Sequence, residues 1–320
     1  MTTIIGVDVG GTSTEAVVID SNGKVLASSQ VGTSTPGGDE VLGSIEAAIA
    51  RLAWRDPVDS LGVGMPGQVD TRAGSVRHAV NLGMDGRPFP LADRLSSAHG
   101  MPVLVENDVR AAAFGVFDKL QRAGEEPGDL ALLSLGTGVA AGVVIDGAIH
   151  RGATGMAGEI GHVVVDRWGP ICRCGQTGCL ETIVSGPAIA SAWKSAGQHT
   201  PASSLFAAAA GGDGTAMKLA NEVLGHLATA IHWLAAAYDV NTIVLGGGLA
   251  GAGEALLDAV RYALIRTAGS SDLATRTLDP NRIRLSPSGG PHGARGAALL
   301  AARRFDLALA TESNPTGGET

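Results

Sequence analysis

Two stretches of this chain repeat the same local pattern, and this repeat limits the possible folds more than any other feature. Residues 4–20 read as an apolar run, the turn Gly10-Gly11-Thr12, a second apolar run and an aspartate; residues 130–146 read the same way around Gly136-Thr137-Gly138. Continuous β-branched and aliphatic residues are typical of strands that are buried on both faces. The sequence therefore predicts one hairpin unit that is used twice.

Each predicted hairpin is followed by alternating strand and helix patterns, which indicate α/β layers. In the first half we expect strands over 24–31, 60–65 and 102–105 and helices over 39–54, 91–98 and 108–120. In the second half we expect helices over 215–238, 254–267 and 294–305 and strands over 242–245 and 282–285. The helix over 216–238 is long and apolar, and from sequence it fits either a core position or a dimer face.

The length of 320 residues suggests about two domains. We expect a smaller α/β domain over residues 1–115, to which a C-terminal helix over about 294–310 returns. A larger α/β domain is expected over residues 116–293, with an insertion rich in Gly, Cys and His over 151–185. The polar residues 311–320 are expected to form a disordered tail.

Composition excludes several classes of protein. With 23 basic and 31 acidic side chains the net charge is −8, which repels a phosphate backbone and argues against a nucleic-acid binder. Aromatic residues make up only 3% of the chain, too few for stacking platforms. The N-terminus shows no secretory signal, and the longest uncharged segment, residues 130–145, is shorter than the ~20 apolar residues of a membrane helix. We expect a cytoplasmic protein with no membrane partner.

The two glycine turns are candidate phosphate-binding loops. Glycine lets backbone N–H groups approach an anion closely, and Asp8, just before the first turn, could bridge to a hydrated Mg²⁺. The alternative is that both are ordinary hairpin turns.

No G-x-x-x-x-G-K-[ST] pattern is present, and the glycine run over 246–253 has no acidic strand end about 20 residues later, so neither a P-loop nor a dinucleotide fold is predicted. An adenosine shelf suits that run better. The predicted nucleotide contacts are Asp8, Gly10, Gly11, Thr12, Gly136, Thr137, Gly138, Gly247 and Gly248.

All three cysteines, Cys172, Cys174 and Cys179, fall within eight residues, and His162 lies ten residues before the first. Three thiolates and one imidazole complete a tetrahedral Zn²⁺ site, and clustered cysteines in a cytoplasmic protein favour metal over disulfide. Such a site has no open position, so its predicted role is structural, with His162 held in place. Chance clustering, or a redox pair with a spare thiol, is the alternative.

Asp108 is a candidate acid or base at the end of a predicted strand. A short apolar strand ends at Glu106-Asn107-Asp108, and a helical pattern begins there. Asp108 could serve only as a helix N-cap. However, α/β folds bind ligands at the carboxyl ends of strands, where Asp108 could accept a proton from a hydroxyl that attacks a terminal phosphate. Glu159 and Glu181, beside His162, suit the adjacent hydroxyls of a sugar ring, although solvated surface acids are an alternative.

Taken together, these motifs resemble the ROK family of sugar kinases and sugar-responsive repressors. The resemblance runs from about residue 4 to residue 305. It rests on the segments Asp8-Val-Gly-Gly-Thr12, Glu106-Asn-Asp108, Leu135-Gly-Thr-Gly138, Gly158-Glu-Ile-Gly-His162, Cys172-x-Cys-Gly-x-x-Gly-Cys179-x-Glu181 and Leu245-Gly-Gly-Gly248.

The resemblance implies an actin-like ATPase fold, that is, a duplicated ribonuclease H-like fold with two domains around a central cleft. It implies ATP with Mg²⁺, a structural Zn²⁺, and phosphorylation of a hexose hydroxyl, commonly at C6. By the resemblance Asp108 is the general base, and His162 serves both zinc and sugar through one ring nitrogen each. The other residues implied to contact the sugar are Gly67, Asn107, Glu159 and Glu181.

Some features depart from the family pattern or stay open. Ser13 follows Gly-Gly-Thr where many family kinases carry Lys, which alters the charge near the phosphates. The first strand begins by residue 4, which leaves no room for the DNA-binding module of the repressors.

We expect an ATP-dependent glucokinase-like enzyme that forms a homodimer or homotetramer. The rivals are an N-acetylglucosamine or N-acetylmannosamine kinase, a non-catalytic sugar sensor, and an actin-like filament or chaperone ATPase. ATP and polyphosphate are not separated as phosphate donors.

Overall fold

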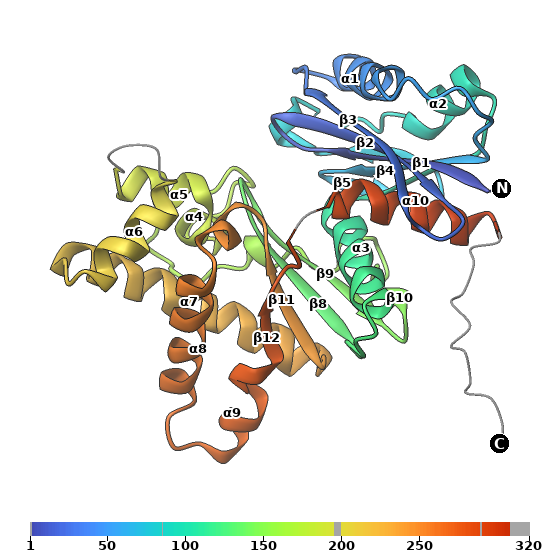
Figure 1. Ribbon diagram of the computed structural model, residues 1–320. Coiled ribbons are helices and arrows are strands. Elements are labelled where there is room, and N and C mark those ends of the chain that lie inside the picture. Colours follow the sequence, from blue (N-terminus) through green and yellow to red (C-terminus); the bar gives the residue numbers. More distant parts are fainter. Residues whose placement is uncertain (1, 85, 195–199, 289, 308–320) are drawn as a thin grey trace, which may run out of the picture. The chain divides into compact units, whose positions relative to one another are not determined.

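The computed structural model describes residues 2–84, 86–194, 200–288 and 290–307 (Figure 1). The chain divides into two compact units. The first consists of residues 1–126 and 289–320, and the second of residues 127–288. The predicted tail over residues 311–320 lies outside the described part of the chain.

The first unit is built on a five-stranded mixed sheet. Its order is β3 (Val25–Gly32), β2 (Ser13–Asp20), β1 (Thr3–Val9), β4 (Ser60–Met65) and β7 (Val103–Asn107). The first three strands pair antiparallel, whereas β4 and β7 join in parallel. Parallel pairing brings the carboxyl ends of β1, β4 and β7 to one edge, and the first glycine turn and Asp108 lie at this edge.

Helices cover both faces of this sheet. Because side chains alternate along a strand, Ile5 and Val7 of β1 join the core under α1 (Gly38–Arg51) and α2 (Leu91–His99). Gly6 lies on the opposite face, under α10 (His292–Arg304). A Cβ at Gly6 would overlap the Ala294 carbonyl, so glycine here lets α10 lie directly on the strand. This face also carries Asp8.

The helix α3 (Asp108–Arg122) packs against α10 along its length. A Cβ at Gly115 would overlap the His292 carbonyl, and Arg295 of α10 pairs with Asp118 near the end of α3. The expected boundary between residues 115 and 116 is therefore wrong as a structural division, because it cuts this helix in the middle of its packing surface. The first unit continues to Glu126.

The second unit repeats the first. Its sheet has the order β10 (Ala148–Ile149), β9 (Val139–Ile145), β8 (Leu130–Leu135), β11 (Thr242–Gly246) and β12 (Ile283–Leu285). The pairing again runs antiparallel, antiparallel, parallel and parallel from the first edge strand to the last. This shared order confirms the repeat that the two glycine turns predict.

The helices of the second unit are α4 (Glu181–Val184), α5 (Gly186–Ala192), α6 (Pro201–Ala210), α7 (Gly214–Tyr238), α8 (Glu254–Ala268) and α9 (Asp272–Thr277). The long helix α7 buries Val223, Leu227, Ile231 and Leu234 in the core of the unit. One face of α7 therefore belongs to the core, which was one of the two roles left open by the sequence. Among the described residues, no helix combines the length and the hydropathy that crossing a bilayer requires.

Several elements were not predicted. They are the hairpin of β5 (Gln68–Asp70) with β6 (Ser75–Arg77) and the helices α4, α5, α6 and α9. The strands and α9 are too short to show a period, and α6 is so rich in Ala that its apolar stripe does not stand out. The helix α5 begins at a capping signal, because the Ser185 hydroxyl accepts a hydrogen bond from the Ala188 amide at 3.2 Å.

Candidate active site and metal centre

The first glycine turn joins β1 to β2 and is held by the end of β3. Within the turn, the Gly10 amide donates to the Ser13 carbonyl at 2.8 Å. Thr33 holds it from outside, because its amide donates to the Thr12 carbonyl at 3.1 Å and its hydroxyl to the Gly10 carbonyl at 2.8 Å. Gly11 is exposed, and no atom lies within 4 Å of the place where its Cβ would be. The tip of the turn is thus open for a ligand to approach its backbone.

Asp8 ends up in a tight pocket of small residues. A Cβ at Gly64 would lie 3.4 Å from both Asp8 Oδ1 and Asp108 Cα, and a Cβ at Gly293 would overlap the Asp8 carboxylate. Burial, together with the negative charges of Asp108 and Glu15, raises the pKa of Asp8 to about 8. A positive charge placed beside this group would offset the repulsion and favour the ionised carboxylate.

The structure separates two roles that the sequence left together at the end of β7. Asn107 is the N-cap of α3, because its Oδ1 accepts a hydrogen bond from the Arg110 amide at 3.1 Å. Asp108 is the first residue of the helix and is half-buried, with its Oδ1 accepting from the Val109 amide at 2.9 Å. The alternative reading of Asp108 as the N-cap is therefore wrong. Asn107 also places its Nδ2 3.5 Å from the Gly67 carbonyl, so two residues implied to contact the sugar lie together.

A buried ion pair lies directly beneath this segment. Glu106 and Arg110 are almost fully buried, and Glu106 Oε1 accepts from Arg110 Nε at 2.8 Å. The same oxygen accepts from the Asn107 amide at 2.9 Å. Sequence reasoning gave this pair no role, although a glutamate that ends an apolar strand, with an arginine four residues later, is a usable signal. Removing one partner would leave a buried charge, so the pair fixes the start of α3.

The second glycine turn, between β8 and β9, is held by the residues around α4. Within the turn, the Gly136 amide donates to the Gly138 carbonyl at 3.0 Å. Glu181 Oε2 accepts from the Val139 amide at 2.9 Å, and the Gly186 amide donates to the Gly136 carbonyl at 2.9 Å. Glu181, which was expected at the sugar, therefore lies against the turn that was expected at the nucleotide.

The glycine run after β11 lies beside the same turn. Gly247 has a φ of 77°, and a Cβ there would lie 2.6 Å from the carbonyl carbon of Leu135, the residue that leads into the turn. Gly248 begins the 3-10 helix Gly248–Ala252, with open space at its Cβ position. The structure thus brings Gly247 next to the second glycine turn.

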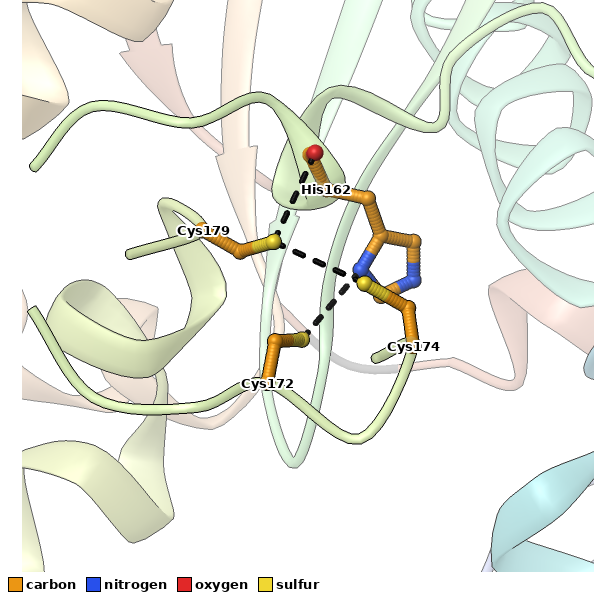
Figure 2. Close-up of side chains that lie close together, drawn as sticks. All are labelled: His162, Cys172, Cys174 and Cys179. Atoms are coloured by element: carbon orange, nitrogen blue, oxygen red, sulfur yellow. Dashed lines mark hydrogen bonds between the residues drawn. The ribbon is translucent and has the colours of Figure 1, made fainter. Parts of the chain in front are cut away.

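His162 and the three cysteines come together as the spacing predicted (Figure 2). Their ligand atoms all lie within 4.8 Å of one another. Cys174 Sγ lies 3.6 Å from Cys179 Sγ, and Cys172 Sγ lies 3.6 Å from His162 Nδ1. Tetrahedral Zn²⁺ with bonds of about 2.0–2.3 Å places its ligands at separations of this size. The donor set and its spacing both fit a closed zinc site.

The imidazole of His162 is turned so that its two nitrogens face different partners. Nδ1 lies in the sulfur cluster, whereas Nε2 lies 4.0 Å from Glu159 Oε2. His162 belongs to the 3-10 helix Ile160–His162 and is half-buried, as is Glu159. The two ring nitrogens therefore face different groups, Nδ1 the sulfur atoms and Nε2 the Glu159 carboxylate.

The predicted site residues divide between the two units. The first unit holds Asp8, Gly10, Gly11, Thr12, Gly67, Asn107 and Asp108, and the second holds Gly136, Thr137, Gly138, Glu159, His162, Cys172, Cys174, Cys179, Glu181, Gly247 and Gly248. Within each unit they gather around that unit's glycine turn or its neighbouring loops.

Comparison with known proteins identifies the family. Residues 4–304 match the ROK family. A glucokinase of Halalkalibacterium halodurans is 34% identical over 301 residues, which cover 86% of this chain and 90% of the relative. This chain belongs to the ROK family. Another relative, an N-acetylmannosamine kinase of Vibrio cholerae, is 31% identical over 81% of this chain and 88% of its own.

A solved ROK structure supports the fold. The ROK glucokinase of Streptomyces griseus, in complex with glucose and AMPPNP, is 30% identical and aligns with a TM-score of 0.78 over 94% of this chain and 99% of its own. The chain therefore has the predicted α/β fold of the actin-like ATPases, and the repeated sheets are the two halves of this ROK architecture.

Proposed function

We propose that this protein is an ATP-dependent hexose kinase and that it converts glucose to glucose 6-phosphate. Glucokinases are among its relatives at 30–34% identity, and its fold matches a glucokinase that holds glucose and an ATP analogue. The observation that carries the chemistry is the placement of Asp108. This half-buried carboxylate stands at the carboxyl end of β7, and capping of the helix is left to Asn107.

Asp108 acts as the general base. A carboxylate near the sugar hydroxyl accepts its proton while the hydroxyl oxygen attacks the γ-phosphorus of ATP; the bond from that phosphorus to the β–γ bridging oxygen breaks, ADP leaves, and the γ-phosphoryl group becomes the phosphate ester of the sugar. The Glu106–Arg110 pair holds the backbone that carries Asp108, so the base is positioned before the substrate binds. Gly67, Asn107, Glu159, His162 and Glu181 are assigned polar contacts to the sugar.

The nucleotide contacts are assigned to the two glycine turns. Backbone amides of Gly10, Gly11 and Thr12 and of Gly136, Thr137 and Gly138 bind phosphate oxygens, and Gly247 and Gly248 lie under the adenosine. Asp8 is assigned to hydrated Mg²⁺, whose positive charge would favour the ionised form of a carboxyl group whose pKa is otherwise raised to about 8. Bound Mg²⁺ supplies positive charge that offsets the charge of the phosphates.

Zinc is assigned to His162, Cys172, Cys174 and Cys179, whose donor atoms fit it in type and spacing. Bound Zn²⁺ keeps the thiolates charged and cross-links the insertion. His162 Nδ1 binds the metal and Nε2 donates to or accepts from a sugar hydroxyl. The predicted cytoplasmic location and the predicted homodimer or homotetramer remain predictions.

Replacement of the base tests the proposal. Asp108→Asn keeps the size of the side chain but removes the proton acceptor, so turnover of glucose should fall by a factor of about 10²–10⁴ while glucose still binds. A coupled assay of ADP release gives kcat, and calorimetry gives the Kd for glucose. Asp93→Asn, at an exposed acid of α2, is the matched control. Near-normal turnover of Asp108→Asn would remove the assignment.

An N-acetylhexosamine kinase is the second candidate, favoured by the N-acetylmannosamine kinase relative at 31% identity. A panel of glucose, mannose, fructose, N-acetylglucosamine and N-acetylmannosamine, each with ATP or polyphosphate, separates the candidates by kcat/KM. A preference for an N-acetyl sugar would replace glucose as the substrate. Sugar binding without turnover on any member of the panel would instead favour a non-catalytic sensor.

A further inference from the structure

The second glycine turn is gripped at two points by one short segment. Glu181, the first residue of α4, accepts from the Val139 amide at 2.9 Å through Oε2. Just beyond the end of α4, the Gly186 amide donates to the Gly136 carbonyl at 2.9 Å. These bonds lie on either side of the turn's tip, so the position of α4 determines the shape of the turn.

The metal-binding segment fixes the start of α4. Cys179 lies two residues before Glu181, and it pairs with Val164 in an isolated β-bridge. The Leu180 amide donates to the Val163 carbonyl at 2.9 Å, and the Leu180 side chain is fully buried. The backbone is therefore anchored immediately before Glu181, at a place from which the Glu181 carboxylate reaches the Val139 amide of the turn.

Glycine at position 138 leaves room for the Glu181 carboxylate. A Cβ at Gly138 would lie 2.8 Å from Glu181 Oε2, closer than real Cβ contacts come. At Gly136, in the same turn, no atom lies within 4 Å of the corresponding place. Neither residue has a positive φ, so alanine fits the backbone at both positions and only Gly138 meets the carboxylate.

We propose that Glu181 is a positioning residue for the nucleotide, in addition to its expected contact with the sugar. One carboxylate oxygen holds the Val139 amide and so keeps the turn in its phosphate-binding shape, while the other oxygen is directed to a sugar hydroxyl. A bound sugar restricts the rotation of Glu181 and thereby orders the turn, so hexose and nucleotide bind with positive cooperativity. This inference rests on the proposed function.

A double-mutant cycle on nucleotide binding tests the contact. The Kd for a non-hydrolysable ATP analogue is measured by calorimetry without sugar in the wild type, Glu181→Ala, Gly138→Ala and the double variant. A hydrogen bond to a charged group supports a rise in Kd of about tenfold for each single variant. The double variant should be no worse than either single one, because both changes break the same contact. Additive effects would overturn the inference.

Two further variants separate positioning from general damage. Glu181→Gln retains an oxygen that can accept from Val139, so it should restore much of the sugar-free nucleotide affinity that Glu181→Ala loses, although its KM for glucose stays raised. Gly136→Ala should change nucleotide affinity equally with or without Glu181→Ala, since its Cβ does not meet the carboxylate. Equal defects in Glu181→Gln and Glu181→Ala would contradict the inference.

The cooperativity is measured by repeating the titrations with saturating glucose. Glucose should tighten nucleotide binding in the wild type and in Ser191→Ala, a change at an exposed position of α5, but not in Glu181→Ala. If the wild type phosphorylates glucose and Glu181→Ala keeps wild-type nucleotide affinity and cooperativity, the inference fails while the proposed function stands. If no sugar is bound or phosphorylated by the wild type, the proposed function itself fails.

Discussion

The two glycine turns occupy equivalent places in the repeated sheets, yet they are held by different chemistry. Thr33 holds the first turn through a hydroxyl and an amide, and its hydroxyl also lies 2.9 Å from that of Thr14. The second turn is held by the carboxylate of Glu181, at the start of a helix that follows the last cysteine of the metal cluster. The first turn is therefore braced by a neutral side chain that follows the neighbouring strand β3, whereas the second is braced by a carboxylate 42 positions from the amide it holds.

The residue two positions before each turn differs as well. Asp8 precedes the first turn and Ser134 occupies the equivalent place before the second. The first turn thus has the Asp8 carboxylate beside it, which is expected to meet a cation, and it is held by Thr33, which is not expected to contact a ligand. The second turn has no such carboxylate, and its brace is itself an expected ligand contact. The two copies of the unit thus differ in where they carry a carboxylate: Asp8 precedes the first turn, whereas Glu181 holds the second turn from α4.

Removal of the metal should distort the second turn and leave the first turn unchanged. This is the largest effect expected from the comparison. Mutation of a residue that only supports a metal ligand typically costs about 10–100-fold in metal affinity or activity. We expect Cys172→Ser, treated with a chelator, to lose at least that much in kcat/KM for glucose, with a matching rise in the Kd for the ATP analogue.

Metal content by mass spectrometry, together with calorimetry, checks this prediction. Ser191→Ala, at an exposed position of α5, is the control and should keep both metal and activity. Metal-free protein with wild-type nucleotide affinity would show that the shape of the second turn does not depend on the segment that carries the three cysteines.

The charge at the first turn should appear as a pH dependence of stability. Because the pKa of Asp8 is raised from 3.8 to about 8 in the folded protein, the folded state binds more protons than the unfolded state between these values. The stability contributed by protonated Asp8 is therefore fully present below about pH 4 and is lost as the pH rises through about 8. Asp8→Asn removes the titrating group and with it this loss. The free energy of unfolding of Asp8→Asn, measured relative to that of the wild type, should therefore be roughly 1–3 kcal/mol higher near pH 8 than at pH 5.

Urea denaturation without ligands at the two pH values measures this difference. Asp93→Asn, which changes an exposed acid by the same isosteric step, should leave the pH dependence as it is in the wild type. If Asp8→Asn shows the same slope as the wild type, Asp8 is already ionised in the folded protein and the contrast with Ser134 loses its electrostatic basis.

How far the sequence could predict this site depended on whether a contact was local. The convergence of His162 with the three cysteines could be predicted from spacing, since all three cysteines fall within eight residues and His162 lies ten residues before the first. The repeat of the sheets could be predicted because both turns punctuate buried strands. The bond from Val139 to Glu181 could not, because it joins residues 42 positions apart through the placement of α4. The domain boundary was misjudged for a similar reason, since only the packing of α10 shows where α3 belongs.

The smallest expected effect concerns the neutral brace. Thr33→Val keeps the shape of the side chain but removes the hydroxyl that donates to the Gly10 carbonyl, which should cost about 1 kcal/mol of stability and raise the Kd for the ATP analogue only a few-fold. The Thr33 amide still holds the Thr12 carbonyl, so the turn keeps one of its two anchors. Thr33→Ser, which retains the hydroxyl, should behave as the wild type. Glucose should tighten nucleotide binding by the same factor in all three proteins, because the bonds from Thr33 end on Gly10 and Thr12, which are not among the residues expected to contact the sugar. A loss of that cooperativity in Thr33→Val would mean that the sugar acts on both turns, and the distinction between a neutral and a ligand-dependent brace would have to be abandoned.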